Sequence, residues 1–269
     1  MDFLKRYRLP LKRKCRLEEW DANDSAGVKN REQAERQTAK NIAAMRALEY
    51  RLYAENRQAL LIVLQGMDAA GKDGAIRHVM AALNPQSCKV TSFKQPSALE
   101  LSHDFLWRIH RVAPATGEIG IFNRSHYEDV LVVRVHDLVP RGVWSRRYDQ
   151  INRFEQHLAE NGTRIIKCFL YIDKEEQKQR LLRRLEDPAR HWKITEADAR
   201  ERERWDDYVA AYEEALSRCN TKAAPWFIVP ANRKWYRNLV LSQIVRKTLT
   251  DMKPQLPKPV ANLDQILIT

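Results

Sequence analysis

A glycine-rich segment at residues 66–74 has the residue types and the spacing needed to bind phosphate. Its sequence, GMDAAGKDG, fits the pattern G-x-x-x-x-G-K. Its glycines allow backbone N–H groups to turn inward around an anion at a helix N-terminus, and the lysine adds a cation. The alternative is a strand-to-helix turn with a solvated lysine. The predicted phosphate-binding residues are Gly66, Ala69, Ala70, Gly71, Lys72, Asp73 and Gly74.

Two aspartates distinguish this segment from the loop of a simple nucleoside triphosphatase. Asp73 stands where a Ser or Thr hydroxyl usually ligates Mg²⁺, which disfavours a plain ATPase or GTPase. Asp68 would repel bound phosphates unless a divalent cation lay between them, so we predict that it is a Mg²⁺ ligand. The alternative for Asp68 is an exposed loop aspartate that caps a turn.

A second polar cluster, NRSHYED at residues 123–129, follows another predicted strand. The planar guanidinium of Arg124 can bind a phosphate at two points, and the adjacent carboxylates could hold a metal directly or through water. The alternative for Arg124 is a structural salt bridge to Glu128 or Asp129. His126 fits a hydrogen-bonded structural role as well as it fits proton transfer. The predicted catalytic residues are Asp68, Lys72, Arg124 and Asp129, with Asp68 and Asp129 as metal ligands.

A region rich in arginine at about residues 174–217 is predicted to form a helical lid. Three of its arginines stand at i, i+3 and i+4 of one helix, so they project within about one turn. Such a flap could close on a chain of phosphates, exclude water and neutralise developing charge. Acidic residues alternate with these cations, so a solvated pair of helices is the alternative. The predicted lid cations are Arg180, Arg183, Arg184, Arg190 and Lys193.

Aromatic and polar residues near the ends of other strands are candidates for contacts with a base. Trp192, in the lid, could stack on a base or anchor the flap, and Trp107 could equally be ordinary helix packing. Asn232, after the last predicted strand, could contact a base or phosphate or cap the following helix. The predicted nucleotide-binding residues are Lys94, Pro96, Arg108, Asn123, Arg124 and Glu128.

The elements that must position these groups alternate between apolar strands and amphipathic helices. Apolar runs predict five strands, at residues 59–64, 89–93, 118–122, 165–172 and 226–229. Apolar spacings of three and four, together with capping residues, predict helices at residues 32–55, 73–83, from 97 onward, 127–135, 143–160, 173–184, 195–217 and 234–252. This alternation predicts an α/β fold with a doubly wound parallel sheet, whose ligands bind at the carboxyl ends of the strands.

Composition restricts the class of protein further. The 269 residues suit a single domain, which we expect to comprise residues 1–269 with a basic N-terminal extension at about 1–30. No segment approaches the ~18 apolar residues of a membrane span, and the basic N-terminus lacks the apolar stretch of a secretory signal. The missing signal leads us to expect a cytoplasmic protein. Four widely spaced cysteines fit reduced thiols better than a disulfide framework or a zinc site. The net charge of +12 indicates an anionic partner.

Four ordered motifs, GMDAAGKDG, FNRSHYEDV, HWK and APWFIVPANRKWYRN, together resemble the polyphosphate kinase 2 family over about residues 10–260. The resemblance implies a P-loop kinase fold, a three-layer α/β/α sandwich with a five-stranded parallel sheet and a helical lid. It also implies Mg²⁺, or alternatively Mn²⁺, and inorganic polyphosphate as phosphoryl donor. By resemblance, Asp68 and Lys72 match the essential pair of the loop, Arg124 the active-site arginine, and Arg180 and its neighbours the lid cations.

Two departures from some relatives point to a subgroup. Those relatives have Asp at the position of Asn123 and Asn-Arg at the positions of Glu128 and Asp129, so a carboxylate lost at Asn123 would be replaced by Asp129. The form seen here resembles the subgroup that phosphorylates both AMP and ADP. We therefore expect a reversible, polyphosphate-dependent kinase that forms ADP and ATP, with guanine nucleotides as alternative substrates. The family also leads us to expect a homo-oligomer, dimer or tetramer, with no nucleic-acid or membrane partner.

Two other functions fit part of the same pattern. One is a nucleotide kinase of the same fold that uses a nucleoside triphosphate as donor, against which Asp73 counts. The other is a non-enzymatic binder of polyphosphate or nucleic acid, which would bind in a salt-sensitive way without turnover.

Overall fold

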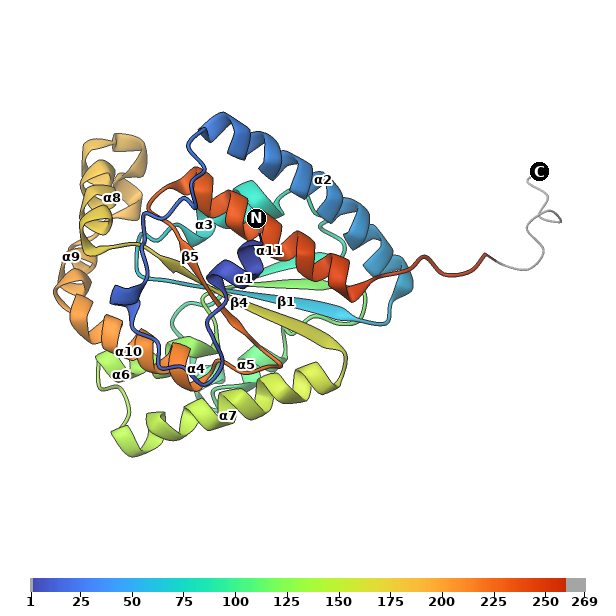
Figure 1. The fold of residues 1–269 in the computed structure, drawn as a ribbon. Coiled ribbons are helices and arrows are strands. Elements are labelled where there is room, and N and C mark those ends of the chain that lie inside the picture. The colour runs from blue at the N-terminus through green and yellow to red at the C-terminus, as the bar shows by residue number, and fades with distance from the viewer. Residues whose placement is uncertain (1, 260–269) are drawn as a thin grey trace.

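Five parallel strands form the sheet that positions the site (Figure 1). The computed structural model describes residues 2–259. The strands are β1 (Ala59–Gln65), β2 (Cys88–Ser92), β3 (Ile119–Asn123), β4 (Thr163–Tyr171) and β5 (Trp226–Pro230), in the order β2-β3-β1-β4-β5. Every residue of β1 is buried, as expected of a central strand covered on both faces. The predicted doubly wound α/β fold is confirmed, and each strand lies where the apolar runs predicted it.

The strand order brings three loops to one edge of the sheet. Leu64 of β1 and Ser92 of β2 both pair with Asn123 of β3, so the carboxyl ends of these strands are level. The chain leaves β1 toward β2 on one side and leaves β3 toward β4 on the other. The loop after β1 therefore lies at the switch point of the sheet, where ligands bind in folds of this kind.

Helices cover both faces of the sheet (Figure 1). On one face α2 (Arg31–Glu55) and α11 (Lys234–Met252) pack together, with α1 (Phe3–Tyr7), α3 (Lys72–Ala75) and the π-helix η2 (Ile76–Met80) beside them. On the other face lie α4 (Ala98–Leu101), α5 (Trp107–His110), the 3₁₀ helix η3 (His126–Val130), α6 (Val132–Val135) and α7 (Arg141–Glu160). Ser97 and Glu100 form a capping box at the start of α4, the helix predicted from residue 97 onward, although α4 is only four residues long.

The predicted lid is built from several short elements. They are α8 (Lys174–Glu186), the 3₁₀ helix η4 (Pro188–Lys193), α9 (Glu196–Glu203) and α10 (Trp205–Arg218). The prediction of one helix over 195–217 was wrong, because the chain breaks at Arg204, whose guanidinium donates to the carbonyl of Val135. The break lets Trp205 enter the core while α9, which buries none of its residues, stays at the surface.

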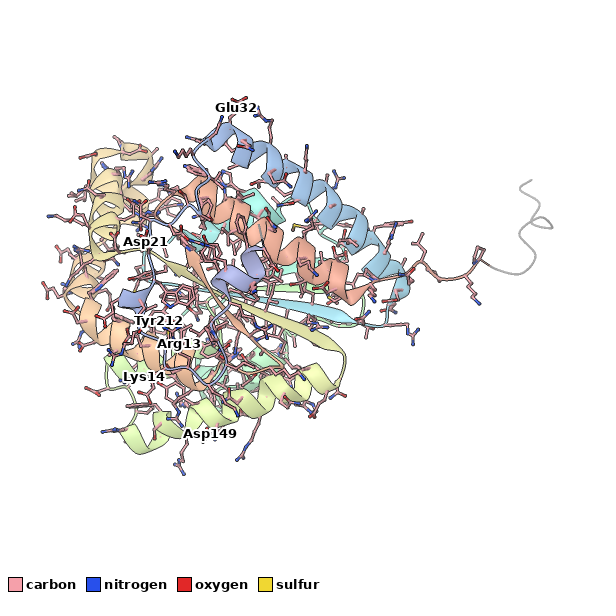
Figure 2. The ribbon with its side chains drawn as sticks, viewed as in Figure 1. Arg13, Lys14, Asp21, Glu32, Asp149 and Tyr212 are labelled. Atoms are coloured by element: carbon pink, nitrogen blue, oxygen red, sulfur yellow. The ribbon has the colours of Figure 1, made fainter. Side chains whose placement is uncertain are left out.

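The N-terminal extension packs along the free edge of β5 and along α10. The N–H of Leu9 donates to the carbonyl of Trp226, and the N–H of Cys15 donates to Oγ of Ser217, at 2.9 and 2.8 Å. Arg13 and Lys14 lie beside α10 in this segment (Figure 2). Covering an unpaired strand edge prevents it from pairing with another chain.

The cysteines and the helices agree with two expectations from composition. All four cysteines are free thiols, in agreement with the absence of a disulfide framework. No helix within residues 2–259 combines the length and the apolar character that crossing a membrane requires.

The close packing of the loop after β1 can be tested with a pair of glycine variants. A Cβ at Gly66 would lie 2.7 Å from the backbone oxygen of Leu170, whereas a Cβ at Gly142 in α7 would meet nothing within 4 Å. Gly66→Ala should lower the free energy of unfolding by ~1–3 kcal/mol, because the backbone of β4 must shift. Gly142→Ala should leave it unchanged or raise it by up to ~1 kcal/mol. Urea unfolding measures both, and equal stability of the two variants would contradict this packing.

Candidate active site

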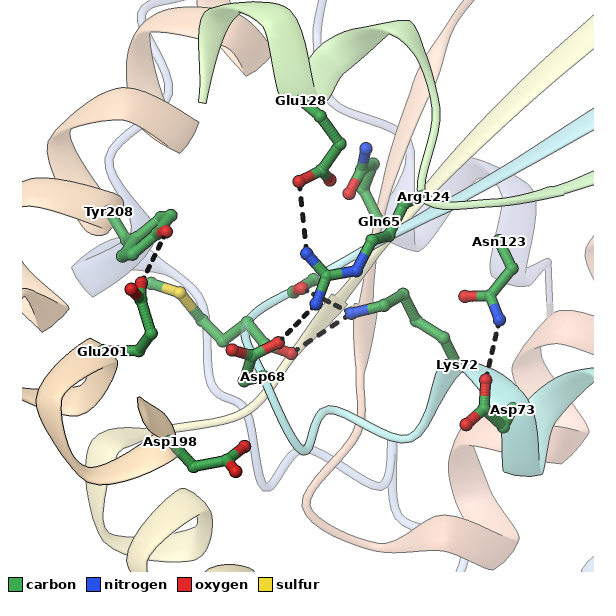
Figure 3. Close-up of polar contacts among 12 residues, drawn as sticks. Gln65, Asp68, Lys72, Asp73, Asn123, Arg124, Glu128, Asp198, Glu201 and Tyr208 are labelled. Atoms are coloured by element: carbon green, nitrogen blue, oxygen red, sulfur yellow. Dashed lines mark hydrogen bonds and ion pairs between the residues drawn. The ribbon is translucent and has the colours of Figure 1, made fainter. Parts of the chain in front are cut away.

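The phosphate-binding loop runs from the end of β1 to the first turn of α3. Ala69 and Gly71 have left-handed backbone conformations, with φ of +63° and +94°. Alternation of left- and right-handed residues turns successive N–H groups toward one point, which creates an anion-binding concavity. Lys72, the first residue of α3, is buried and donates from Nζ to the carbonyls of Gly66 and Met67 at 2.8 and 3.4 Å (Figure 3).

The environment of Lys72 disfavours its positive charge. Burial, followed by repulsion from the nearby Arg124 guanidinium, lowers the pKa of Lys72 to about 8. An anion bound in the loop would oppose both effects and raise this pKa again. Phosphate binding and protonation of Lys72 should therefore be coupled.

Arg124 connects the second polar cluster to the loop. It follows β3 with a left-handed backbone, φ +62°, and donates from Nη2 to Oδ1 of Asp68 at 2.7 Å and from Nη1 to Oε2 of Glu128 at 3.2 Å (Figure 3). The carboxylates of Glu128 and Asp68 raise the pKa of Arg124 above its usual value. The salt bridge to Glu128 considered from the sequence is thus present. The bond to Asp68 brings the guanidinium next to the loop.

A cavity of about 830 Å³ lies at this edge of the sheet. All six predicted nucleotide-binding residues line it, and so do the predicted catalytic residues Asp68, Lys72 and Asp129. Phe93, Val132 and Leu138 give it an apolar wall. Trp107 does not line it. The Trp107 ring stacks on His103 at 4.0 Å between centroids, which favours ordinary packing.

The carboxylates around this cavity differ in their partners. Asp73 accepts a 2.7 Å bond from Nδ2 of Asn123, which links the loop to the end of β3 (Figure 3). Asp129 is buried and accepts from Nη1 of Arg147 on α7 at 2.9 Å. Burial raises the pKa of Asp129 to about 6, against the effect of Arg147. Its metal role stays a prediction. Sequence reasoning missed Arg147, because it lies 18 residues away on a helix with no motif of its own.

A second cavity, of about 660 Å³, borders the same loop and is strongly basic. It shares Ala69, Gly71, Asp73 and Arg184 with the first cavity. Nine lysine and arginine side chains line it, and they include all five predicted lid cations. Among the described residues, the other four cations of its lining are Arg31, Arg77, Lys234 and Arg237. The acidic residues described in its lining are Glu35, Asp73 and Asp187.

Arg180, one of the five predicted lid cations, is buried against the phosphate-binding loop. Its side chain is 6% exposed, and all five of its N–H groups donate to protein acceptors. Nη1 donates to the carbonyls of Ala69 and Ala70, each at 2.9 Å, and the other groups bond Glu176 and the carbonyls of Ala231 and Asn232. Arg180 lines the basic cavity with the other predicted lid cations, and these bonds hold it against the loop. Its role toward a ligand stays a prediction.

The sequence leaves two alternative roles open for each of three further residues, His126, Asn232 and Trp192. His126 is fully buried beside Glu155, at 3.1 Å, in a network with the buried Lys167, and it lines neither cavity, which favours the structural role. Asn232 donates to Oδ2 of Asp173 at 2.6 Å and so ties the start of α8 to the end of β5. Trp192 is 77% exposed and lines the basic cavity, so both of its predicted roles stay open.

Comparison with known proteins agrees with this arrangement. A family model described as Polyphosphate kinase 2 matches residues 28–257. The chain is 44% identical to a Meiothermus ruber protein named AMP/ADP-polyphosphate phosphotransferase, over 98% of this chain and 100% of that one. It is also 44% identical to a Rhodopseudomonas palustris protein named ADP-polyphosphate phosphotransferase, over 94% and 92% of the two chains. The crystal structure of Polyphosphate Kinase 2 from Arthrobacter aurescens TC1 superposes with a TM-score of 0.94 at 39% identity, covering 98% of this chain and 94% of that one.

The lowered pKa of Lys72 predicts a pH dependence of anion binding. Below about pH 8 the free protein holds Lys72 protonated, and above it the lysine loses the charge that attracts phosphate. The Kd for inorganic tripolyphosphate should therefore rise as the pH increases through about 8. Calorimetric titration on both sides of this pH measures it. In Lys72→Met the binding should be weaker and almost independent of pH over the same range. An equal pH dependence in both proteins would assign the titration to another group.

Proposed function

The chain belongs to the polyphosphate kinase 2 family, and we propose that it transfers the terminal phosphoryl group of inorganic polyphosphate to AMP and to ADP. The observation that carries this proposal is that two cavities of different character meet at one phosphate-binding loop. One of them suits a polyanionic donor and the other suits a nucleotide acceptor. A transfer between the two requires such a shared boundary, because the reacting atoms must approach within about 3–3.5 Å.

The basic cavity is the donor site in this proposal. Polyphosphate carries a negative charge on every unit. The described residues give this cavity nine cationic side chains against three carboxylates, which provide the complementary potential. Arg183, Arg190 and Lys193 come from α8 and η4, at the surface of the molecule. Closure of these elements over the donor would exclude water from the transferred group.

The larger cavity is the acceptor site. Its apolar wall, which includes Phe93, Val132 and Leu138, suits the faces of a nucleobase. Lys94 and Arg108 supply positive charge for the phosphates of the nucleotide. Arg108 is buried and donates to the carbonyl of Lys94 at 3.0 Å, so its guanidinium is held in place. The acceptors are proposed from the names of the similar proteins and from the sequence pattern at residues 123–129.

The chemistry needs positioning and charge stabilisation more than acid or base catalysis. A terminal phosphate oxygen of AMP or ADP attacks the terminal phosphorus of the donor. The bond from that phosphorus to the bridging oxygen breaks, and the shortened polyphosphate keeps the electron pair. Lys72 and Arg124 line the larger cavity beside the loop that both cavities share, where they can stabilise the negative charge that develops on the transferred oxygens.

A divalent cation fits the carboxylates beside this loop. Mg²⁺ is usually bound by one or two carboxylates together with phosphates and waters. The larger cavity is lined by Asp68, whose side chain is 37% exposed, and by Asp73 and Asp129. Among residues 2–259 no group of three His, Cys, Asp or Glu side chains could form a complete protein cage. Bound with the donor, Mg²⁺ would neutralise phosphate charge, and the predicted ligands Asp68 and Asp129 would hold it there. The homo-oligomeric state stays a prediction.

The proposed reaction can be followed directly from its products. The protein is mixed with Mg²⁺, AMP and polyphosphate as sole donor at low salt, and nucleotides are separated by chromatography. We expect ADP first and then ATP. Formation of ATP from added ADP without any product from AMP would contradict the double acceptor specificity. Turnover with ATP as donor but none with polyphosphate would contradict the proposal that polyphosphate is the donor.

Lys72 should be needed for the rate. Lys72→Ala removes a preorganised cation from the transferred group, and turnover should fall by ~10² or more. Lys40→Ala is the matched control, because Lys40 is exposed on α2 and lines neither cavity. The initial rate of ADP formation from AMP measures both variants. A Lys72→Ala protein that keeps its rate would remove Lys72 from the catalytic residues.

A further inference from the structure

We propose that Arg237, on α11, binds the phosphates of the donor from a fixed position, whereas Arg180 only positions the loop. The proposal rests on the proposed function for the identity of the donor. It concerns a residue that sequence reasoning did not single out, although Arg237 falls within the last of the four motifs.

Arg237 lies directly against the phosphate-binding loop. Its side chain is 2% exposed, and Nη1 donates to the carbonyl of Gly71 at 3.0 Å. A Cβ at Gly71 would collide with Nη1, and one at Gly74 would lie 3.5 Å from Nη2. The guanidinium thus packs against the backbone that leads into α3, and it also lines the basic cavity.

The number of free N–H groups separates the two arginines. A guanidinium has five N–H groups. Arg180 uses all five on protein acceptors. Arg237 uses three, one on Gly71 and two on Oδ1 of Asn238, at 3.1 Å from Nε and 2.8 Å from Nη2. Within the described residues, the other two N–H groups of Arg237 have no hydrogen-bond acceptor, so they remain for a ligand.

Charge leads to the same assignment. No carboxylate within residues 2–259 forms an ion pair with Arg237, whereas Arg180 pairs with Glu176 at 2.7 Å. Burial and the neighbouring Arg180 lower the pKa of Arg237 to about 10. A buried cation without a counter-ion is costly, and an incoming anion removes that cost. The donor is the polyanion that this cavity accepts, so its phosphates are the missing counter-ion.

The position of Arg237 is rigid. Helix α11 packs along α2 and carries eleven buried residues, including Tyr236 and Leu241. Asn238 orients the guanidinium from the next position of the same helix. Arg237 therefore meets the donor at the loop itself, while the cations of α8 and η4 meet it from the other wall.

Tripolyphosphate binding and steady-state kinetics test this assignment. In Arg237→Gln we expect the Kd for tripolyphosphate, measured by calorimetry, and the KM for polyphosphate to rise about tenfold or more, since charge-assisted bonds are lost. The KM for AMP should change less than about twofold, because Arg237 does not line the acceptor cavity. Arg246→Gln is the control: it removes a positive charge from the same helix, and since Arg246 lines neither the acceptor cavity nor the basic cavity, all three constants should stay unchanged.

Asn238→Ala provides a second route to the answer. It removes the acceptor that orients Arg237 without removing the charge, and the Kd for tripolyphosphate should rise about threefold to fivefold. A folded Arg237→Gln protein, by circular dichroism, whose Kd stays within about twofold of wild type would overturn the proposal. If Arg237→Gln does not fold, an unchanged Kd in Asn238→Ala overturns it. A wild-type protein that binds tripolyphosphate through Arg237 but yields no ADP from AMP would support this assignment and overturn the proposed function.

Discussion

Positive charge crowded around one backbone loop is the constraint on which this site depends. Lys72, Arg124, Arg180 and Arg237 all surround residues 66–74, and each compensates its charge differently. Lys72 donates to carbonyls, Arg124 donates to two carboxylates, and Arg180 donates every N–H of its guanidinium to protein acceptors. Two N–H groups of Arg237 have no acceptor among residues 2–259. Burial lowers the pKa of Lys72, Arg180 and Arg237, so an anion bound at the loop would stabilise these positive charges.

The same bonds give the loop its shape. Arg180 and Arg237 hold the carbonyls of Ala69, Ala70 and Gly71, which are three consecutive residues. The N–H of Ala70 donates to the carbonyl of Met67 at 3.0 Å, so the loop is also closed by a turn of its own. The sheet contributes the rest, since its order places the loop between the ends of β3 and β4. One loop can therefore border both a basic cavity and a nucleotide-sized cavity.

Prediction from the sequence succeeded where the signal was local. The strands β1 and β5 are wholly buried and lie on apolar runs, and the last helix was predicted with the bounds that α11 has. Prediction failed where contacts between distant parts of the chain determine the local structure. Nothing in the charged run at 195–217 announces the break at Arg204, which depends on the burial of Trp205 and on a bond to Val135. Arginine spacing alone could not show that Arg180 points into the protein.

The sequence by itself determined the family, the α/β fold and the loop chemistry, because glycine spacing and apolar runs act through the local backbone and through burial. Only the tertiary structure decided which cations face a ligand. That choice depends on acceptors distant along the chain: Gly71 meets Arg237 across 166 residues, and Ala69 meets Arg180 across 111. A guanidinium has the same sequence signal whether its N–H groups are satisfied by carbonyls or left for phosphate, so the fold must be known before they can be counted.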